Sequence, residues 1–316
     1  MNQLVPLVLL LMTGCVDAGI EFHTLPVAED PPPILEPEIV DVPVLTEEPP
    51  PVKYPEGYKC LRHPTDYSIM PGLVGQSMTQ VGDEYVIMSS GVSNLIVANG
   101  LLEPVFETLL TVDGKVFEGH PVGLAYQEGY PTFIGSYGRI LLVDWDVLMI
   151  EGTLDNALQR AIPDSMGLGY SRPVYVTYQG DTVLATADYY SPDGTRLRLF
   201  DPWLLKDTTS TGSGLPGLWI RTYVVDDWVQ SMTFHEGTLY LVRNSLGPSG
   251  WEIDRLDLET GEVVPFRRFT GIGSSELEGF GFLPDGREVY VTGDHDGYIW
   301  VGSPAVDEQG PENCAL

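Results

Sequence analysis

The chain has 316 residues, which is enough for one large domain or two domains of ordinary size. Hydrophobic residues make up 43% of it, so it can build a sizeable core, while 35 glycines and 26 prolines argue against a helix bundle. The 16 basic and 45 acidic residues give a net charge of -29. This charge argues against nucleic acid as a partner, because phosphate binding needs clustered lysines and arginines, and it also disfavours docking on anionic lipid.

The first fifteen residues have the pattern of an export signal. The apolar run from Leu4 to Met12 is too short to span a bilayer as a helix, and two small residues separate it from Cys15. This pattern resembles the signal of bacterial lipoproteins. The resemblance implies removal of residues 1–14, acylation of Cys15 and anchoring at the outer membrane or cell surface of a bacterium. The alternative is an ordinary secretory signal with an incidental cysteine.

Residues 15–58 are predicted to be a disordered linker rich in proline and glutamate. Ten prolines fall between Pro26 and Pro55, mixed with acidic residues and isolated aliphatic ones. Such a chain favours extended polyproline II, and its acidic residues repel one another. We therefore expect a spacer between membrane and domain, with a polyproline ligand for another domain as the alternative.

Residues 59–316 are predicted to form an all-β domain built from repeats. Short β-rich runs alternate with turn residues, and each unit reads as strand, tight turn, strand. The units open at Gln76, Pro121, Pro173, Val229 and Glu276. One such sheet cannot bury both faces, so neighbouring units must pack around an axis as a single β-propeller. Five openings predict five blades, and six if residues 59–72 supply more than a closing strand. The one predicted helix is Thr153 to Ala161.

The phrases VQSMTFHEGTLYLVRN, DRLDLETGEVV and ELEGFGFLPDGREVYV resemble extracytoplasmic propellers of the NHL-repeat and gluconolactonase-like kind. The resemblance covers about residues 70 to 303 and rests on the blade pattern alone. It implies a fold that carries lactonases, cyclases, scaffolds and binding modules, so it does not choose among these functions. Gluconolactonase-like enzymes hold a divalent ion on the axis, and Glu278 is the residue that matches their glutamate.

Cys60 and Cys314 are predicted to form a disulfide. Exported proteins mature in oxidising space, and Cys15 is already assigned to the lipid. The two remaining cysteines flank the domain, and a propeller places its first and last strands side by side. The alternative is two free thiols in the flanking segments.

A ring of polar residues is predicted at the axial mouth, where the innermost strands begin. Alignment of the units on their turns makes Gln76, Gln230 and Glu278 equivalent, with His120 and Arg172 near the corresponding place in the other two units. Such a ring suits a small polar ligand or an ion. The alternative is that these residues only hydrogen-bond the water of a channel.

Motifs for familiar enzyme chemistry are missing from the sequence: it has no G-x-S-x-G, no P-loop and no H-E-x-x-H. Asp294 and Asp296 are weak candidates for calcium, together with Glu278, and a solvated turn is the alternative. No other cofactor is expected. We therefore expect a monomeric binding or scaffold module at the cell envelope, for a protein or a small polar ligand. The alternative is a metal-dependent, lactonase-like hydrolase that uses Glu278.

Overall fold

Strands fill most of the chain that the computed structural model describes. The described residues are 39–40, 59–63, 75–89, 93–163, 172–189, 194–207, 219–244, 250–270, 276–293 and 299–303. Among them there is no helix with the length and apolar character that crossing a bilayer requires. Cys15, Cys314, Asp294 and Asp296 lie outside the described residues, so the predictions that rest on them stay predictions.

The described strands group into five sheets in chain order, each an antiparallel meander with an added strand in two cases. The first contains β3 (Gly75–Val81), β4 (Glu84–Ser89), β5 (Asn94–Ala98) and β6 (Pro104–Leu109). The second contains β9 (Gly123–Ala125), β10 (Thr132–Ser136), β11 (Arg139–Val143) and β12 (Leu158–Pro163). The third contains β13 (Val174–Tyr178), β14 (Asp181–Ala187), β15 (Thr195–Phe200) and β16 (Trp219–Val225).

The fourth sheet contains β17 (Val229–His235), β18 (Thr238–Arg243), β19 (Gly250–Leu256) and β20 (Val263–Thr270). The fifth contains β21 (Leu277–Phe282), β22 (Glu288–Thr292), β23 (Ile299–Ser303) and, at its outer edge, β2 (Lys59–His63). A small separate hairpin is formed by β7 (Thr111–Val112) and β8 (Lys115–Val116).

Two-residue turns join the first two strands of the first, third and fourth sheets, as the sequence predicts, whereas longer loops do so in the second and fifth. In the β13–β14 and β17–β18 hairpins both turn residues have positive φ: Gln179 and Gly180 at 52° and 88°, Glu236 and Gly237 at 46° and 79°. Two successive positive values define the turn type that matches the right-handed twist of paired strands. Glycine adopts such values at no steric cost, which explains its place at the second position.

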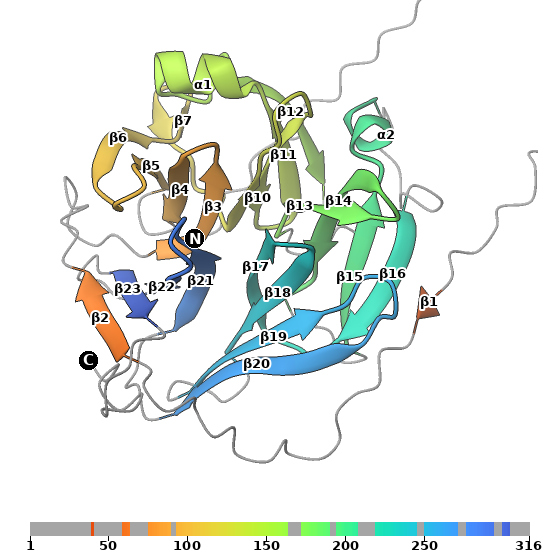
Figure 1. Cartoon of the computed structure of the whole chain (residues 1–316). Coiled ribbons are helices and arrows are strands. Elements are labelled where there is room, and N and C mark those ends of the chain that lie inside the picture. The colour runs from red at the N-terminus through yellow and green to blue at the C-terminus, as the bar shows by residue number, and fades with distance from the viewer. Residues whose placement is uncertain are drawn as a thin grey trace, which may run out of the picture. The chain divides into compact units, whose positions relative to one another are not determined.

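The five sheets pack in a closed ring around the inner strands (Figure 1). The inner strands β3, β9, β13, β17 and β21 contact one another in that order, and β21 returns to contact β3. The described core divides into five hydrophobic clusters, each drawn from two consecutive sheets. Polar bridges add to this packing: the hydroxyl of Thr79 on β3 donates to the carbonyl of Leu124 on β9 at 2.8 Å. The predicted all-β propeller is confirmed, and its five sheets match the five predicted openings.

The N-terminal part of the chain contributes one strand to each of two sheets. β2 pairs antiparallel with β23, Cys60 lying opposite Gly302, so residues 59–63 supply the closing strand of the last sheet. β1 (Ile39–Val40) pairs in parallel with β16 at the edge of the third sheet. These two residues are the only described part of the predicted linker 15–58, and the domain boundaries stay predictions.

The prediction of a helix at Thr153 to Ala161 is wrong. Its second half forms β12, and a helix lies just before it, as α1 (Trp145–Glu151). The carboxylate of Asp144 accepts the backbone N–H of Val147 at 3.1 Å, which caps the helix start, and Gly152 ends the helix in a left-handed conformation. A second short helix, α2 (Pro202–Asp207), follows β15.

Candidate functional site

The three polar residues predicted to be equivalent each occupy a β-bulge near the start of an inner strand. In the pairing of β3 with β4 the extra residue is Gln76, and Gln230 and Glu278 hold the same place in β17 and β21. A bulge leaves one residue without a cross-strand partner and re-aims its side chain. All three are buried, with 4–5% of their surface exposed. The sequence repeat therefore reflects a repeated backbone geometry.

His120 and Arg172 precede the inner strands β9 and β13, and they meet the bulged residues. Nε2 of His120 lies 3.0 Å from Oε1 of Gln76 and donates to it, because an amide oxygen only accepts. Arg172 is buried and donates from Nε to the backbone carbonyl of Gln230 at 2.6 Å. Its charge also acts on both His120 and Glu278. The structure thus brings the five predicted residues together.

Glu278 is a buried carboxyl group whose pKa is raised well above its ordinary value. Burial is the main cause, because it disfavours the charged form. Glu276, two residues earlier in the chain, raises the pKa further, while the charge of Arg172 and a hydrogen bond with Gln76 lower it. Oε2 of Glu278 has no hydrogen-bond partner within the described part of the chain. A buried carboxyl group with an unsatisfied oxygen is suited to receive a polar ligand.

The two bases of the cluster have lowered pKa values. Burial lowers the pKa of Arg172 to about 10, against the opposing effect of Glu278, so the guanidinium stays charged at neutral pH. Burial, and then the charge of Arg172, lower the pKa of His120 to about 4. His120 is therefore neutral at pH 7 and acts as a hydrogen-bonding group rather than a cation.

Aromatic residues border this cluster, and the sequence analysis did not place them in the site. Tyr137 stacks on His120 with ring centroids 4.2 Å apart, and the Arg172 guanidinium lies 4.9 Å from the ring centroid of Tyr189. Trp228 meets Tyr189 edge-on at 5.1 Å. Tyr137 and Trp228 are 50% and 41% exposed, which is unusual for such large side chains. We use the name axial mouth for the five polar residues with Glu276, Tyr137, Tyr189 and Trp228.

Local signals for some of these missed residues exist in the sequence. Glu276 stands two positions before Glu278, the spacing that puts two side chains on one face of an extended segment. Tyr137 occupies the tight turn next to Gly138, between the two strands of the second hairpin. Both signals are local. Neither residue stands at a position that is equivalent between the units, and the predicted ring contains only such positions.

No group of three or more His, Cys, Asp or Glu side chains within the described residues has the geometry to hold a metal ion. Glu278 has Glu276 beside it and faces the cation Arg172, which favours hydrogen bonding over metal ligation. Asp294 and Asp296 lie outside the described part of the chain. The calcium prediction therefore stays a prediction.

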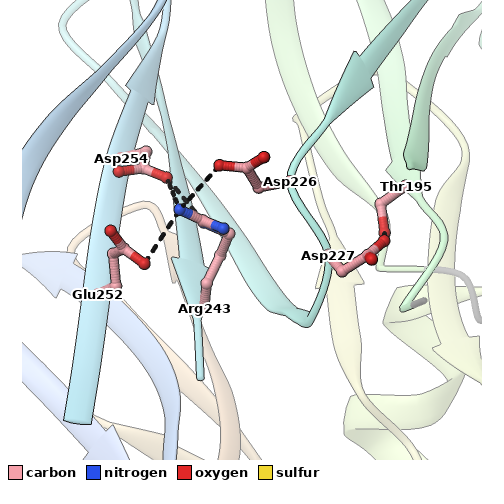
Figure 2. A network of polar contacts seen from close by, with 6 residues as sticks. All are labelled: Thr195, Asp226, Asp227, Arg243, Glu252 and Asp254. Atoms are coloured by element: carbon pink, nitrogen blue, oxygen red, sulfur yellow. Dashed lines mark hydrogen bonds and ion pairs between the residues drawn. The ribbon is translucent and has the colours of Figure 1, made fainter. Parts of the chain in front are cut away.

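A second buried ionic cluster lies between the third and fourth sheets (Figure 2). The Arg243 guanidinium contacts Asp254 at 2.6 Å, Glu252 at 3.0 Å and Asp226 at 3.4 Å. Burial raises the pKa of Asp254, against the opposing effect of Arg243. Asp226 belongs to the connection between β16 and β17, so the cluster fixes that connection to β18 and β19. We assign it a structural role.

The comparisons with known proteins support the fold. No family model matches the chain, and no curated protein is similar to it in sequence. The glutaminyl cyclase of Myxococcus xanthus is similar in structure, with 15% identity and a TM-score of 0.50 over 80% of this chain and 100% of that one. The virginiamycin B lyase of Staphylococcus aureus has 13% identity and a TM-score of 0.37, covering 74% and 67% of the two chains. At 15% identity the likeness to the cyclase shows the fold alone, and together with the ring of sheets it shows that the chain is a β-propeller.

Proposed function

We propose that this propeller binds a small polar ligand at the axial mouth while a lipid on Cys15 holds it at the cell envelope. The observation that carries the binding proposal is Glu278, a buried carboxyl group with a raised pKa and an oxygen unpaired among the described residues. A buried polar atom left unsatisfied costs about 1–3 kcal/mol, so a ligand that pairs with it gains affinity. We also propose that the protein is a monomer located at the outer membrane or cell surface. A protein partner would bind another face of the propeller.

The chemistry of the axial mouth favours a ligand with hydrogen-bond donors and acceptors close together, such as a carboxamide. Arg172 supplies a cation for a carbonyl oxygen, and the unpaired Oε2 of Glu278 is a further polar group for the ligand. Glu276 and the amide of Gln76 supply acceptors for an N–H group. The exposed rings of Tyr137 and Trp228 offer apolar surface at the rim.

The binding proposal is tested by titration of the full chain with glutamine, glutaminylalanine and pyroglutamate. We expect at least one of these amides to bind, and the Glu278→Gln variant to bind it at least about tenfold more weakly, or ~1.4 kcal/mol. Glu84→Gln is the matched control, because Glu84 is exposed at the start of β4, away from this cluster. Equal affinity in all three proteins, or no binding by any amide, overturns the proposal and favours a water-filled channel.

The second candidate function is an enzyme in which Glu278 moves a proton, as a cyclase or a lactonase-like hydrolase. The specific observation in its favour is the raised pKa of Glu278, because general acids and bases work best with pKa values near the operating pH. One protein of similar fold is a glutaminyl cyclase. Its name implies that a glutaminyl group is closed into a ring. Such closure joins an amine to a carboxamide carbon and releases ammonia, so the leaving nitrogen must receive a proton.

Turnover separates the two candidates. The full chain is incubated with glutaminylalanine and, separately, with a gluconolactone, with and without added calcium, and ammonia release and ring opening are followed. An enzyme gives a rate that Glu278→Gln reduces by about 10²–10⁴, the range for a lost general acid. Binding without turnover leaves the binding module as the function.

The lipid anchor and the disulfide are tested by intact mass of the full chain expressed in a bacterium. Cleavage before Cys15 with addition of acyl chains supports the anchor, and Cys15→Ser should remain uncleaved at this site. A mass two hydrogens light that is recovered on reduction supports a Cys60–Cys314 bridge. Full thiol mass in an unreduced sample contradicts the bridge.

A further inference from the structure

A cavity of about 260 Å³ opens on the axis at the far ends of the inner strands from the axial mouth. It is bordered by Gln80 near the end of β3, Tyr175 on β13, His235 at the end of β17 and Phe282 at the end of β21. Met78, buried between Gln76 and Gln80 on the same strand, forms part of its floor. We call this space the distal cavity. The axial mouth and the distal cavity share the inner strands, but the binding proposal above does not involve this second space.

The described lining of the distal cavity contains no acidic side chain and no lysine or arginine, in a chain that carries 61 of these residues. Its imidazole, that of His235, stacks on Phe282 with ring centroids 4.2 Å apart, and its Nε2 lies 3.9 Å from Oε1 of the exposed Glu236. An ionised ligand would lose hydration here without gaining a counter-charge, and that loss is costly. The lining therefore selects a neutral ligand.

The hydroxyl groups near the walls are already engaged by the fold. Thr79 donates to the carbonyl of Leu124, Tyr85 to that of Phe282 at 2.8 Å, and Thr233 to that of Phe280. These bonds fix the side chains, and their O–H groups are no longer available as donors to a ligand. Hydrogen bonding toward a ligand is left to the amides of Gln80 and Gln127 at the exposed rim, the hydroxyl of Tyr126 and the imidazole of His235. One N–H of Gln80 already donates to the carbonyl of Gly82 at 3.1 Å, so its amide oxygen and its second N–H remain for a ligand. An amide offers both a donor and an acceptor.

Aromatic rings supply the rest of the recognition surface. The lining includes Tyr126, Tyr175, Phe234 and Phe282 in addition to His235. Apolar ring faces combined with a few placed polar groups are the usual composition of small-ligand sites. The volume is just below the lower end of such sites, roughly 300 Å³, so it admits one ring rather than a chain. A sugar ring has the complementary chemistry, since it presents C–H faces to aromatic rings and hydroxyl groups to amides.

We propose that the distal cavity binds a neutral sugar ring, with aromatic side chains against its faces and the amides of Gln80 and Gln127 on its hydroxyl groups. The proposal is independent of the axial mouth: either site can fail without the other. It gives the two sites different ligand classes, a hydrogen-bonding polar group at the axial mouth and a saccharide in the distal cavity.

The test follows the methionine methyl groups of the full chain by NMR during titration with glucose, galactose and N-acetylglucosamine. Met78 and Met232 line the distal cavity, and Leu substitutions assign their signals. Met149 of α1 does not line the cavity and serves as an internal reference. We expect a saturable shift of the two lining methyl groups with at least one sugar, and no shift of the reference.

Variants and a charged sugar locate and characterise the binding. Gln80→Ala combined with Gln127→Ala should weaken binding at least about tenfold, or ~1.4 kcal/mol. Gln159→Ala is the matched control, because Gln159 is exposed on the outer strand β12 and lies outside this lining. Glucuronate, which carries a carboxylate, should bind more weakly than glucose. Absence of a shift with all three neutral sugars, undiminished affinity in the double variant, or tighter binding of glucuronate overturns the proposal.

Discussion

Replacing Glu278 by glutamine should change how the stability of the protein depends on pH. The pKa of the folded protein's Glu278 is raised, chiefly by burial, so the folded state keeps a proton that the unfolded state releases above about pH 4.5. Stability is therefore lost as pH rises toward the folded pKa. The loss is about 1.4 kcal/mol per pH unit for one proton. Glutamine has nearly the same shape and does not titrate, so the variant lacks this loss.

The measurement is urea unfolding of wild type and Glu278→Gln at several pH values from about 5 to about 7.5. The difference between their free energies of unfolding should grow with pH in favour of the variant. Other buried acids with raised pKa values, such as Asp254, contribute equally to both proteins and cancel. Glu84→Gln should follow the wild type. A difference that stays constant with pH would mean that Glu278 is ionised in the folded protein, which refutes the reasoning.

Three further substitutions test other parts of the structure. Arg172→Gln should raise the pKa of His120 above about 4 without restoring its ordinary value, since burial is the larger cause; NMR titration of the imidazole checks this, and an unchanged pKa contradicts it. Arg243→Ala should destabilise the protein by about 3–5 kcal/mol in urea unfolding, because it leaves carboxylates buried without their cation; a loss below ~1 kcal/mol would contradict a structural role. Gly279→Ala should lower the free energy of unfolding by about 1–3 kcal/mol, because the new Cβ would meet the β3 backbone at 3.0–3.1 Å. Gly281→Ala should lower it less, because the Cβ there meets only the flexible end of a methionine. The reverse order in urea unfolding would contradict this packing.

The fold was predictable because its signals are local and repeated. Three of the five sheets begin with a hairpin whose two-residue turn is readable from the local sequence, and the QSMT phrase marks the same bulge in β3 and β17. The equivalence of Gln76, Gln230 and Glu278 followed from that repetition. The ring arrangement followed because a single sheet cannot bury both of its apolar faces without neighbouring sheets.

Other features were not predictable from one sequence, because tertiary packing decides them. The segment Thr153 to Ala161 has helical periodicity, but pairing of β12 with β11 overrides it, and the capped helix α1 forms before it instead. The stacking of Tyr137 on His120 joins segments whose proximity only the fold creates. The distal cavity likewise arises from residues spread over all five inner strands, and the QSMT repeat that supplies four of them does not by itself indicate a cavity.

The pairing of β2 with β23 sets the order in which the molecule can be finished. Among the described strands, β2 (Lys59–His63) pairs only with β23, which ends at Ser303. The first strand of the domain therefore stays unpaired until the last strand has been synthesised. Closing so long a loop is slow compared with forming each hairpin. During synthesis, the earlier sheets must persist as an open arc, with one flank of β3 unprotected until the C-terminal strands have formed. A truncation near the C-terminus would therefore leave an open ring with unpaired strand edges that can aggregate, rather than a slightly smaller propeller.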